Sequence, residues 1–73
     1  MASIAENEIR TLLGYLVEHN REHEAELRDW AARIGATRPT VAGRLLEAAT
    51  KLADVTGSLQ QALVALDEPT SRA

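Results

Sequence analysis

The stretch Ile34-Gly35-Ala36-Thr37-Arg38-Pro39 separates two long helical patterns, and its shortness decides the fold. Glycine commonly ends a helix in a left-handed conformation, so we expect Gly35 to stop the first helix. Thr37 or Arg38 can cap the second helix, and Pro39 suits its first turn, where a missing N–H costs little. The sequence therefore predicts a turn over residues 35–38. A connection this short returns the second helix alongside the first.

Apolar residues recur at alternating steps of four and three on both sides of this turn, which is a heptad pattern. The pattern contains Ile9, Leu13, Leu16, Asn20, His23, Leu27, Trp30 and Ile34 before the turn, and Val41, Leu45, Ala48, Leu52, Val55, Leu59, Ala62 and Leu66 after it. Ser3 and Glu6 have the spacing of a capping box. We expect helices over about residues 4–34 and 39–66, followed by a frayed polar tail over 67–73.

These patterns predict an all-α protein in which residues 1–73 form a single helical-hairpin domain. A chain of 73 residues buries only a modest core and usually needs a partner, a metal or a disulfide. Additional apolar residues widen both stripes beyond a two-helix contact, and they are Leu12, Val17, Ala31, Ala42, Ala49 and Leu63. We therefore expect two antiparallel hairpins to pair as a twofold-symmetric homodimer, which is a four-helix bundle.

Composition also bounds the location and the partners. The sequence has no cysteine, which excludes disulfides and thiolate metal sites and fits a cytoplasmic protein. Charged residues interrupt every apolar run, so we expect neither a membrane-spanning helix nor a signal peptide. The net charge of −3 provides no general attraction to nucleic acid or to an anionic membrane. The expected partner is a second copy of the chain, or else a larger protein.

A polar cluster stands out in the middle of the first helical pattern. His19, Glu22, His23 and Glu26 are spaced at i, i+3, i+4 and i+7, so all four can project from one side of a helix. Two imidazoles four residues apart can share one metal ion, and the carboxylates can add oxygen ligands or orient the rings. This donor set suits a divalent transition metal such as Zn, Ni, Co or Fe better than Ca or Mg. The cluster predicts a metal site for metal handling or sensing.

The same residues support two other interpretations. Asn20 and His23 fall on the predicted seam, where buried polar side chains can fix the register of a dimer without binding any ligand. The protein would then be a structural or protein-interaction module. Alternatively, protonation of His23 and its symmetry mate in mildly acidic solution would oppose dimerisation.

Two further classes of function have weaker support. Ala31, Gly35 and Val41 have the spacing of a bacterial helix-turn-helix, which would place Arg38 and Arg44 on a DNA-recognition helix. Both helices are much longer than that motif uses, and acidic residues dilute the basic ones, so we do not expect nucleic-acid binding. The sequence contains no evident nucleophile–base set and no Gly-rich phosphate loop. We therefore do not expect an enzyme that acts alone.

The segment from His19 to Ala31, His-Asn-Arg-Glu-His-Glu-Ala-Glu-Leu-Arg-Asp-Trp-Ala, resembles a motif of small, uncharacterised prokaryotic helical-hairpin domains. That motif reads H-N-x-E-H-x-x-E-[L/F]-x-x-W-A. The similarity extends more weakly over residues 45–49 and 59–63. The resemblance implies a two-helix unit whose signature residues are His19, Asn20, Glu22, His23, Glu26 and Trp30. It implies no particular activity.

Overall fold

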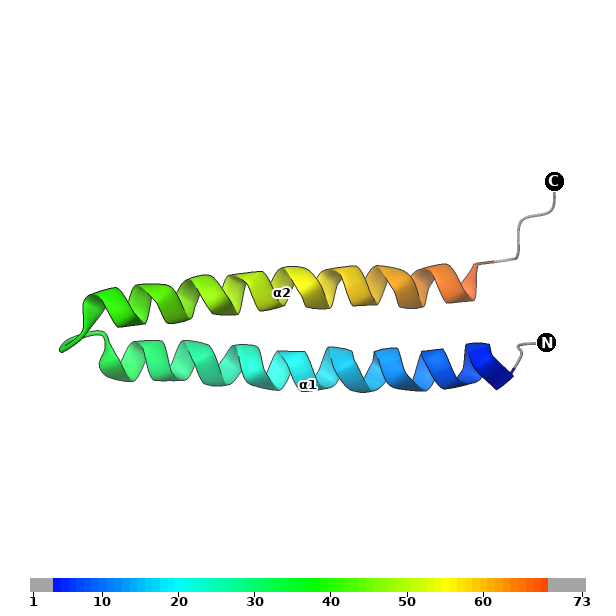
Figure 1. The fold of residues 1–73 in the computed structure, drawn as a ribbon, viewed down its shortest axis with the longest axis horizontal. Coiled ribbons are helices and arrows are strands. Elements are labelled where there is room, and N and C mark those ends of the chain that lie inside the picture. The colour runs from blue at the N-terminus through cyan, green and yellow to red at the C-terminus, as the bar shows by residue number, and fades with distance from the viewer. Residues whose placement is uncertain (1–3, 69–73) are drawn as a thin grey trace.

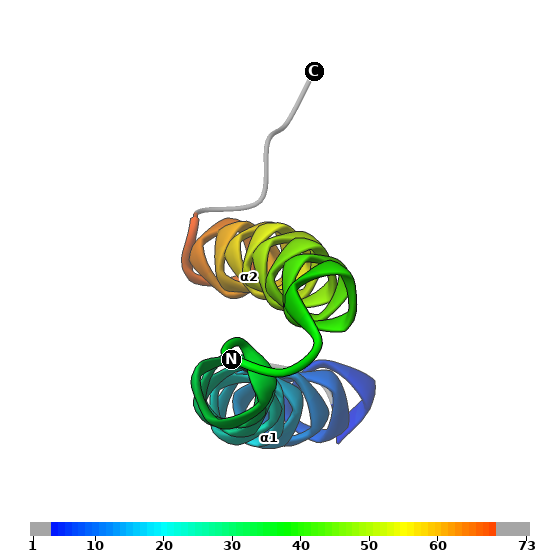
Figure 2. The same cartoon turned by 90° about the vertical axis from the view of Figure 1, so that its left-hand side faces the viewer.

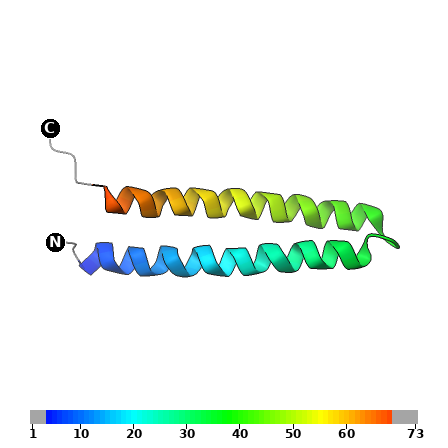
Figure 3. The same cartoon turned by 180° about the vertical axis from the view of Figure 1, so that it is seen from behind.

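The computed structural model of the chain describes residues 4–68, which form two long antiparallel helices joined by a short turn (Figures 1 and 3). Helix α1 spans Ile4–Ile34 and helix α2 spans Pro39–Asp67. The prediction of an all-α helical hairpin is confirmed, and α2 extends one residue beyond the predicted end. Ser3 of the predicted capping box and most of the predicted frayed tail, residues 69–73, lie outside the described residues.

The turn differs from the predicted one in the conformation of its glycine. No residue among 4–68 has a positive φ, so the expected left-handed stop at Gly35 is wrong. The chain reverses instead through backbone hydrogen bonds, in which the N–H groups of Thr37 and Arg38 donate to the Ile34 carbonyl over 3.1 and 2.8 Å. Arg38 occupies the N-cap position without a side-chain hydrogen bond, and Pro39 begins α2.

Gly35 follows the last turn of α1, where there is little space for a side chain. A Cβ at this position would lie 3.2 Å from the Ala31 carbonyl oxygen and 3.9 Å from the Ala42 Cβ. The first contact is tighter than side chains normally make, so a larger residue would crowd the last turn of α1, whereas the contact with Ala42 is at ordinary van der Waals distance.

Small side chains fill the centre of the contact between the helices. Ala49 is completely buried, and Val17, Ala31 and Ala42 are between 3% and 8% exposed. Thr56 is also buried, and its hydroxyl donates to the Leu52 carbonyl over 3.0 Å, which satisfies the polar group within its own helix. The complete seam consists of Arg10, Leu13, Val17, Asn20, Glu24, Leu27, Ala31 and Ile34 on α1, and Ala42, Leu45, Ala49, Leu52, Thr56, Leu59, Leu63 and Leu66 on α2.

This seam corrects the predicted register by one residue at every second position. Ile9, Trp30 and Val55 were predicted to lie in the seam, but they are 47%, 57% and 49% exposed. The His23 side chain is 52% exposed, whereas Asn20 is half-buried in the seam as predicted. Small residues replace the larger ones because two helices that touch along their length must approach closely.

The displaced apolar residues emerge on one face of the hairpin. Viewed from one end, antiparallel helices turn in opposite senses, so residues that directly precede a seam position point the same way on α1 and on α2. Trp30 and Ile9 on α1 therefore share a face with Val55 on α2. Each of these three side chains is about half exposed.

The arrangement of the helices also bears on the helix-turn-helix interpretation. The two helices lie side by side along their length (Figures 1 and 2), whereas a DNA-binding helix-turn-helix crosses its helices at about 90–120°. The helices stay together as far as the end opposite the turn, where Arg10 on α1 forms an ion pair with Asp67 on α2. Arg44, a predicted recognition residue, pairs with Glu47 over 3.1 Å. Within residues 4–68, neither helix is apolar enough over a sufficient length to cross a membrane.

The register can be tested by enlarging adjacent alanines on α2. We expect Ala49→Leu to lower the free energy of unfolding by about 1–3 kcal/mol, because the buried position has no space for the added carbons. The matched control is Ala48→Leu at the exposed neighbouring position, with an expected change within about 0.5 kcal/mol. Urea unfolding followed by circular dichroism, in the presence of a chelator, measures both. A larger loss for Ala48→Leu would contradict the observed seam.

Candidate metal site

Three of the four predicted site residues form a continuous chain of contacts on the exposed side of α1. The Nε2 atoms of His19 and His23 lie 3.0 Å apart, and the two rings meet edge to face with centroids 4.4 Å apart. On the other side of its ring, His23 Nδ1 lies 3.1 Å from Glu26 Oε1. The helix creates this row because residues three and four apart are neighbours on its surface.

The contact with Glu26 determines which nitrogen of His23 is free to bind a ligand. An ionised carboxylate only accepts hydrogen bonds, so Nδ1 of His23 carries the hydrogen in this pair. In a neutral ring the Nε2 atom then presents a lone pair, and His19 Nε2–H donates to it. A histidine whose Nδ1–H is held by a carboxylate, with the lone pair on Nε2, is the usual arrangement of a metal ligand.

The spacing of the two Nε2 atoms fits a shared ion. Nitrogen ligands lie about 2.0–2.1 Å from Zn²⁺, so two such atoms are separated by about 3.0 Å at a right angle and about 3.4 Å at the tetrahedral angle. The observed separation of 3.0 Å falls at the lower end of this range. The rings therefore need little displacement to bind one ion together, and His19 would carry its hydrogen on Nδ1 once its Nε2 binds the ion.

Tyr15 extends the row and was missed by the sequence analysis. Its ring stacks on His19 with centroids 5.3 Å apart and planes inclined by 15°. This stacking limits the rotation of the His19 ring, as the contact with Glu26 does for the His23 ring. The signal was present in the sequence, because Tyr15 precedes His19 by four residues and is an aromatic neighbour on the helix surface.

The structure does not bring Glu22 into this row. No hydrogen bond or ion pair joins Glu22 to another residue in the described part of the chain. Among residues 4–68, no group of three or more His, Cys, Asp or Glu side chains has an arrangement that could hold a metal. A single hairpin thus presents two adjacent nitrogen atoms and an orienting carboxylate.

The surroundings of the row are hydrated and acidic. The side chains of His23 and Glu26 are 52% and 65% exposed, so water has access to the nitrogen atoms. Neighbouring charges on α1 are partly neutralised, because Arg21 lies 3.6 Å from Glu18 and Arg28 lies 3.0 Å from Glu24. Glu22 and Glu26 have no arginine partner among these ion pairs, so the field at the row favours a cation.

Comparison with known proteins places the chain among small domains. The family described as a domain of unknown function (DUF8180) matches residues 9–66. The chain belongs to this family. An uncharacterized protein of Archaeoglobus fulgidus is 38% identical to this DUF8180 chain over 52 residues, which cover 71% of the chain and 84% of that protein. No solved structure matches the chain. The predicted membership in a family of small uncharacterised domains is confirmed.

The hydrogen-bond direction at His23 can be tested without metal. We expect long-range ¹H–¹⁵N correlation spectra at neutral pH to show the neutral His23 ring with its hydrogen on Nδ1, because Glu26 accepts from that atom. Glu26→Gln should shift the population toward the other tautomer. Glu18→Gln is the matched control on the same helix and should leave the spectrum of His23 unchanged. A ring with its hydrogen on Nε2 in the unaltered protein would contradict the arrangement.

Proposed function

We propose that this protein is a homodimeric helical hairpin that binds a divalent transition metal through His19 and His23, in metal handling or sensing. The observation that carries the proposal is the 3.0 Å separation of the two Nε2 atoms, combined with the Glu26 carboxylate on His23 Nδ1. Two imidazoles suit Zn, Ni, Co or Fe(II), and their borderline softness disfavours Ca and Mg. We place the protein in the cytoplasm, where proteins do without disulfides, and its sequence contains no cysteine.

Each side chain has a distinct part in this proposal. His19 and His23 provide the nitrogen ligands, and Tyr15 limits the orientations of the His19 ring. Glu26 orients His23 and makes its Nε2 more basic, which strengthens the bond to a metal. Glu22 follows His19 by one helical turn and supplies an oxygen ligand or orients a ring once an ion is bound.

The half-exposed site suits exchange of the ion better than permanent storage. Two protein nitrogen atoms leave other coordination positions for water or for donors from a second molecule. A metal held by few ligands and open to solvent is released readily, which is what a carrier or a sensor requires. A structural zinc site, in contrast, is closed by four protein ligands.

The histidine pair provides the direct test. We expect the tag-free protein to bind Zn²⁺, Ni²⁺ or Co²⁺ in isothermal titration and native mass spectrometry. The His19→Ala/His23→Ala variant should lose this binding, because it removes both nitrogen ligands and the chain has no other histidine. Glu18→Ala is the control, since it removes an adjacent exposed carboxylate without touching the row. Metal-free spectra of the unaltered protein with all three ions would end the proposal and favour a structural module.

A second test separates orientation from ligation. We expect Glu26→Gln to weaken metal binding by about tenfold, the lower end of the loss on removing a group that orients a histidine ligand. Glu22→Gln measures the contribution of the other carboxylate, and Glu18→Gln is again the control. Competition with a coloured chelator gives the affinities. Equal affinities for Glu26→Gln and the unaltered protein would show that Glu26 has no part in the site.

A further inference from the structure

We infer that a second copy of the chain completes the metal site, with the α1 helices of two protomers packed antiparallel across a twofold axis at the level of residue 21. This inference rests on the proposed function, because it names the partner and the geometry of the same histidine pair. Four histidine nitrogen atoms, two from each protomer, would then surround one ion.

The proposed contact surface is a second heptad stripe on α1. Each of its members directly precedes a seam residue, so the stripe lies beside the seam on the face that also carries Val55 of α2. Its apolar members are unusually exposed, with Leu12 at 53% and Trp30 at 57%. We call it the histidine stripe, and it consists of Ile9, Leu12, Leu16, His19, His23, Glu26, Trp30 and Arg33.

The histidine stripe is arranged symmetrically about residue 21. His19 and His23 lie two residues before and after this point, and Leu12 and Trp30 lie nine residues before and after it. An antiparallel pair of α1 helices with its axis at residue 21 therefore places His19 opposite His23 of the partner subunit. The same axis places Leu12 opposite Trp30 of the partner subunit. A twofold interface requires this kind of self-complementary surface.

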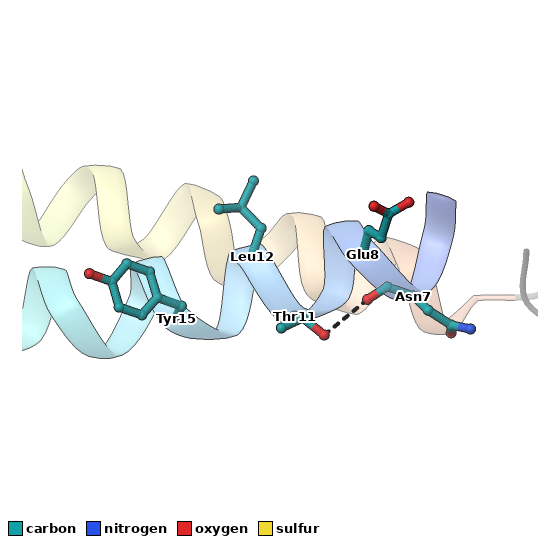
Figure 4. A pocket seen from close by; sticks show the side chains of 5 residues that line it. All are labelled: Asn7, Glu8, Thr11, Leu12 and Tyr15. Carbon is teal, nitrogen blue, oxygen red and sulfur yellow. Dashed lines mark hydrogen bonds between the residues drawn. The ribbon is translucent and has the colours of Figure 1, made fainter. Parts of the chain in front are cut away.

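The shape of α1 agrees with this pairing. A hollow of about 650 Å³ lies on its N-terminal half and is lined by Asn7, Glu8, Thr11, Leu12 and Tyr15. Figure 4 shows Leu12 and Tyr15 projecting from successive turns beside the hollow, where the Thr11 hydroxyl donates to the Asn7 carbonyl over 3.1 Å. Of the residues that line the hollow, Leu12 belongs to the histidine stripe, and exposed Trp30 lies on the other half of that stripe. Tryptophan is the preferred anchor of protein interfaces, and a hollow beside Leu12 can receive the partner's Trp30.

A second copy would add ligands to those of one hairpin. Among the described residues of one hairpin, no group of three or more His, Cys, Asp or Glu side chains could hold a metal ion. Two histidine pairs related by a twofold axis provide four nitrogen atoms, which fill the positions that a single hairpin leaves to water. Release of the ion then accompanies separation of the protomers, after which each hairpin again holds only two ligands. The two Glu26 carboxylates would remain on the Nδ1 atoms and would not need to move.

Charge makes this association dependent on the ion. Each chain has a net charge of −3, and each brings Glu26 of the histidine stripe close to the proposed axis. Two acidic chains oppose association, and a divalent cation between them reduces that repulsion. The metal is thus expected to hold the protomers together, besides being held by them.

The lengths of the helices allow the contact to extend over almost all of α1. The middle of Ile4–Ile34 is residue 19, so an axis at residue 21 overlaps residues 8–34 of both protomers. The middle of Pro39–Asp67 is residue 53, level with the same axis, so α2 pairs with α2 of the partner subunit and closes a four-helix bundle.

The test uses cysteines placed in separate chains, because the natural sequence has none. We expect a mixture of Leu12→Cys and Trp30→Cys proteins to form a disulfide-linked dimer on oxidation with Zn²⁺ present. Neither variant should cross-link alone, because the two copies of residue 12 would lie about 27 Å apart along the bundle. The pair Ile9→Cys and Arg33→Cys repeats the test with Leu12 and Trp30 intact. Circular dichroism checks that each variant is helical.

The outcomes distinguish this arrangement from others. Cross-linking of each single variant with itself would mean that the α1 helices are parallel. Cross-linking in no sample would mean that another face forms the contact, so either result overturns the inference.

Native mass spectrometry of the unaltered protein gives the stoichiometry. One ion per two chains, with dissociation to single chains on chelation, is the expected result. One ion per single chain would overturn the shared site and leave the proposed metal binding intact. Dimers without any metal would overturn both proposals.

Discussion

The close approach of α1 and α2 is the constraint on which the other features of this hairpin depend. Ala31, Ala42 and Ala49 are buried between the helices, and their small side chains allow a short distance between the helix axes. Such a contact buries little area per residue, so the larger apolar side chains cannot all be accommodated inside one hairpin. They appear beside the seam, and this placement produces the face that carries Trp30 and the histidine pair.

The fold could be predicted from the sequence because the signals that define it are local. Pro39 and the heptad spacing indicate where the helices begin and end, whatever the tertiary contacts are. The register could not be predicted in the same way. The apolar pattern permits two heptad seams, which share every second residue and differ by one residue at the positions between. Hydrophobicity favoured the one with Ile9 and Trp30. The recurrence of Ala42, Ala49 and Thr56 every seven residues was the signal for the other, because small residues permit contact between two helices.

The proximity of His19, His23 and Glu26 was predictable from the sequence, but the roles of their side chains and the places of Glu22 and Tyr15 were not. Helical spacing alone places His19, His23 and Glu26 next to one another. Helical spacing does not determine whether a carboxylate contacts a ring nitrogen or points away from the ring, because the backbone is the same in both cases. Rotamers decide this, and they place Glu26 on Nδ1 of His23 and leave Glu22 apart. The Tyr15 stacking likewise depends on side-chain angles that periodicity cannot specify.

The position of the turn also determines which end of the hairpin opens first, and this is the end opposite the turn. Contacts next to the turn join residues close in sequence, whereas the ion pair between Arg10 and Asp67 joins residues 57 positions apart. Closing the longer loop costs more chain entropy, so protection of backbone amides against hydrogen exchange should decline from the turn to the opposite end. Trp30 lies in the more protected half and the hollow at Leu12 in the other. The hollow therefore lies in the part of the hairpin that opens locally more often. Such opening would limit how long a bound group stays in the hollow.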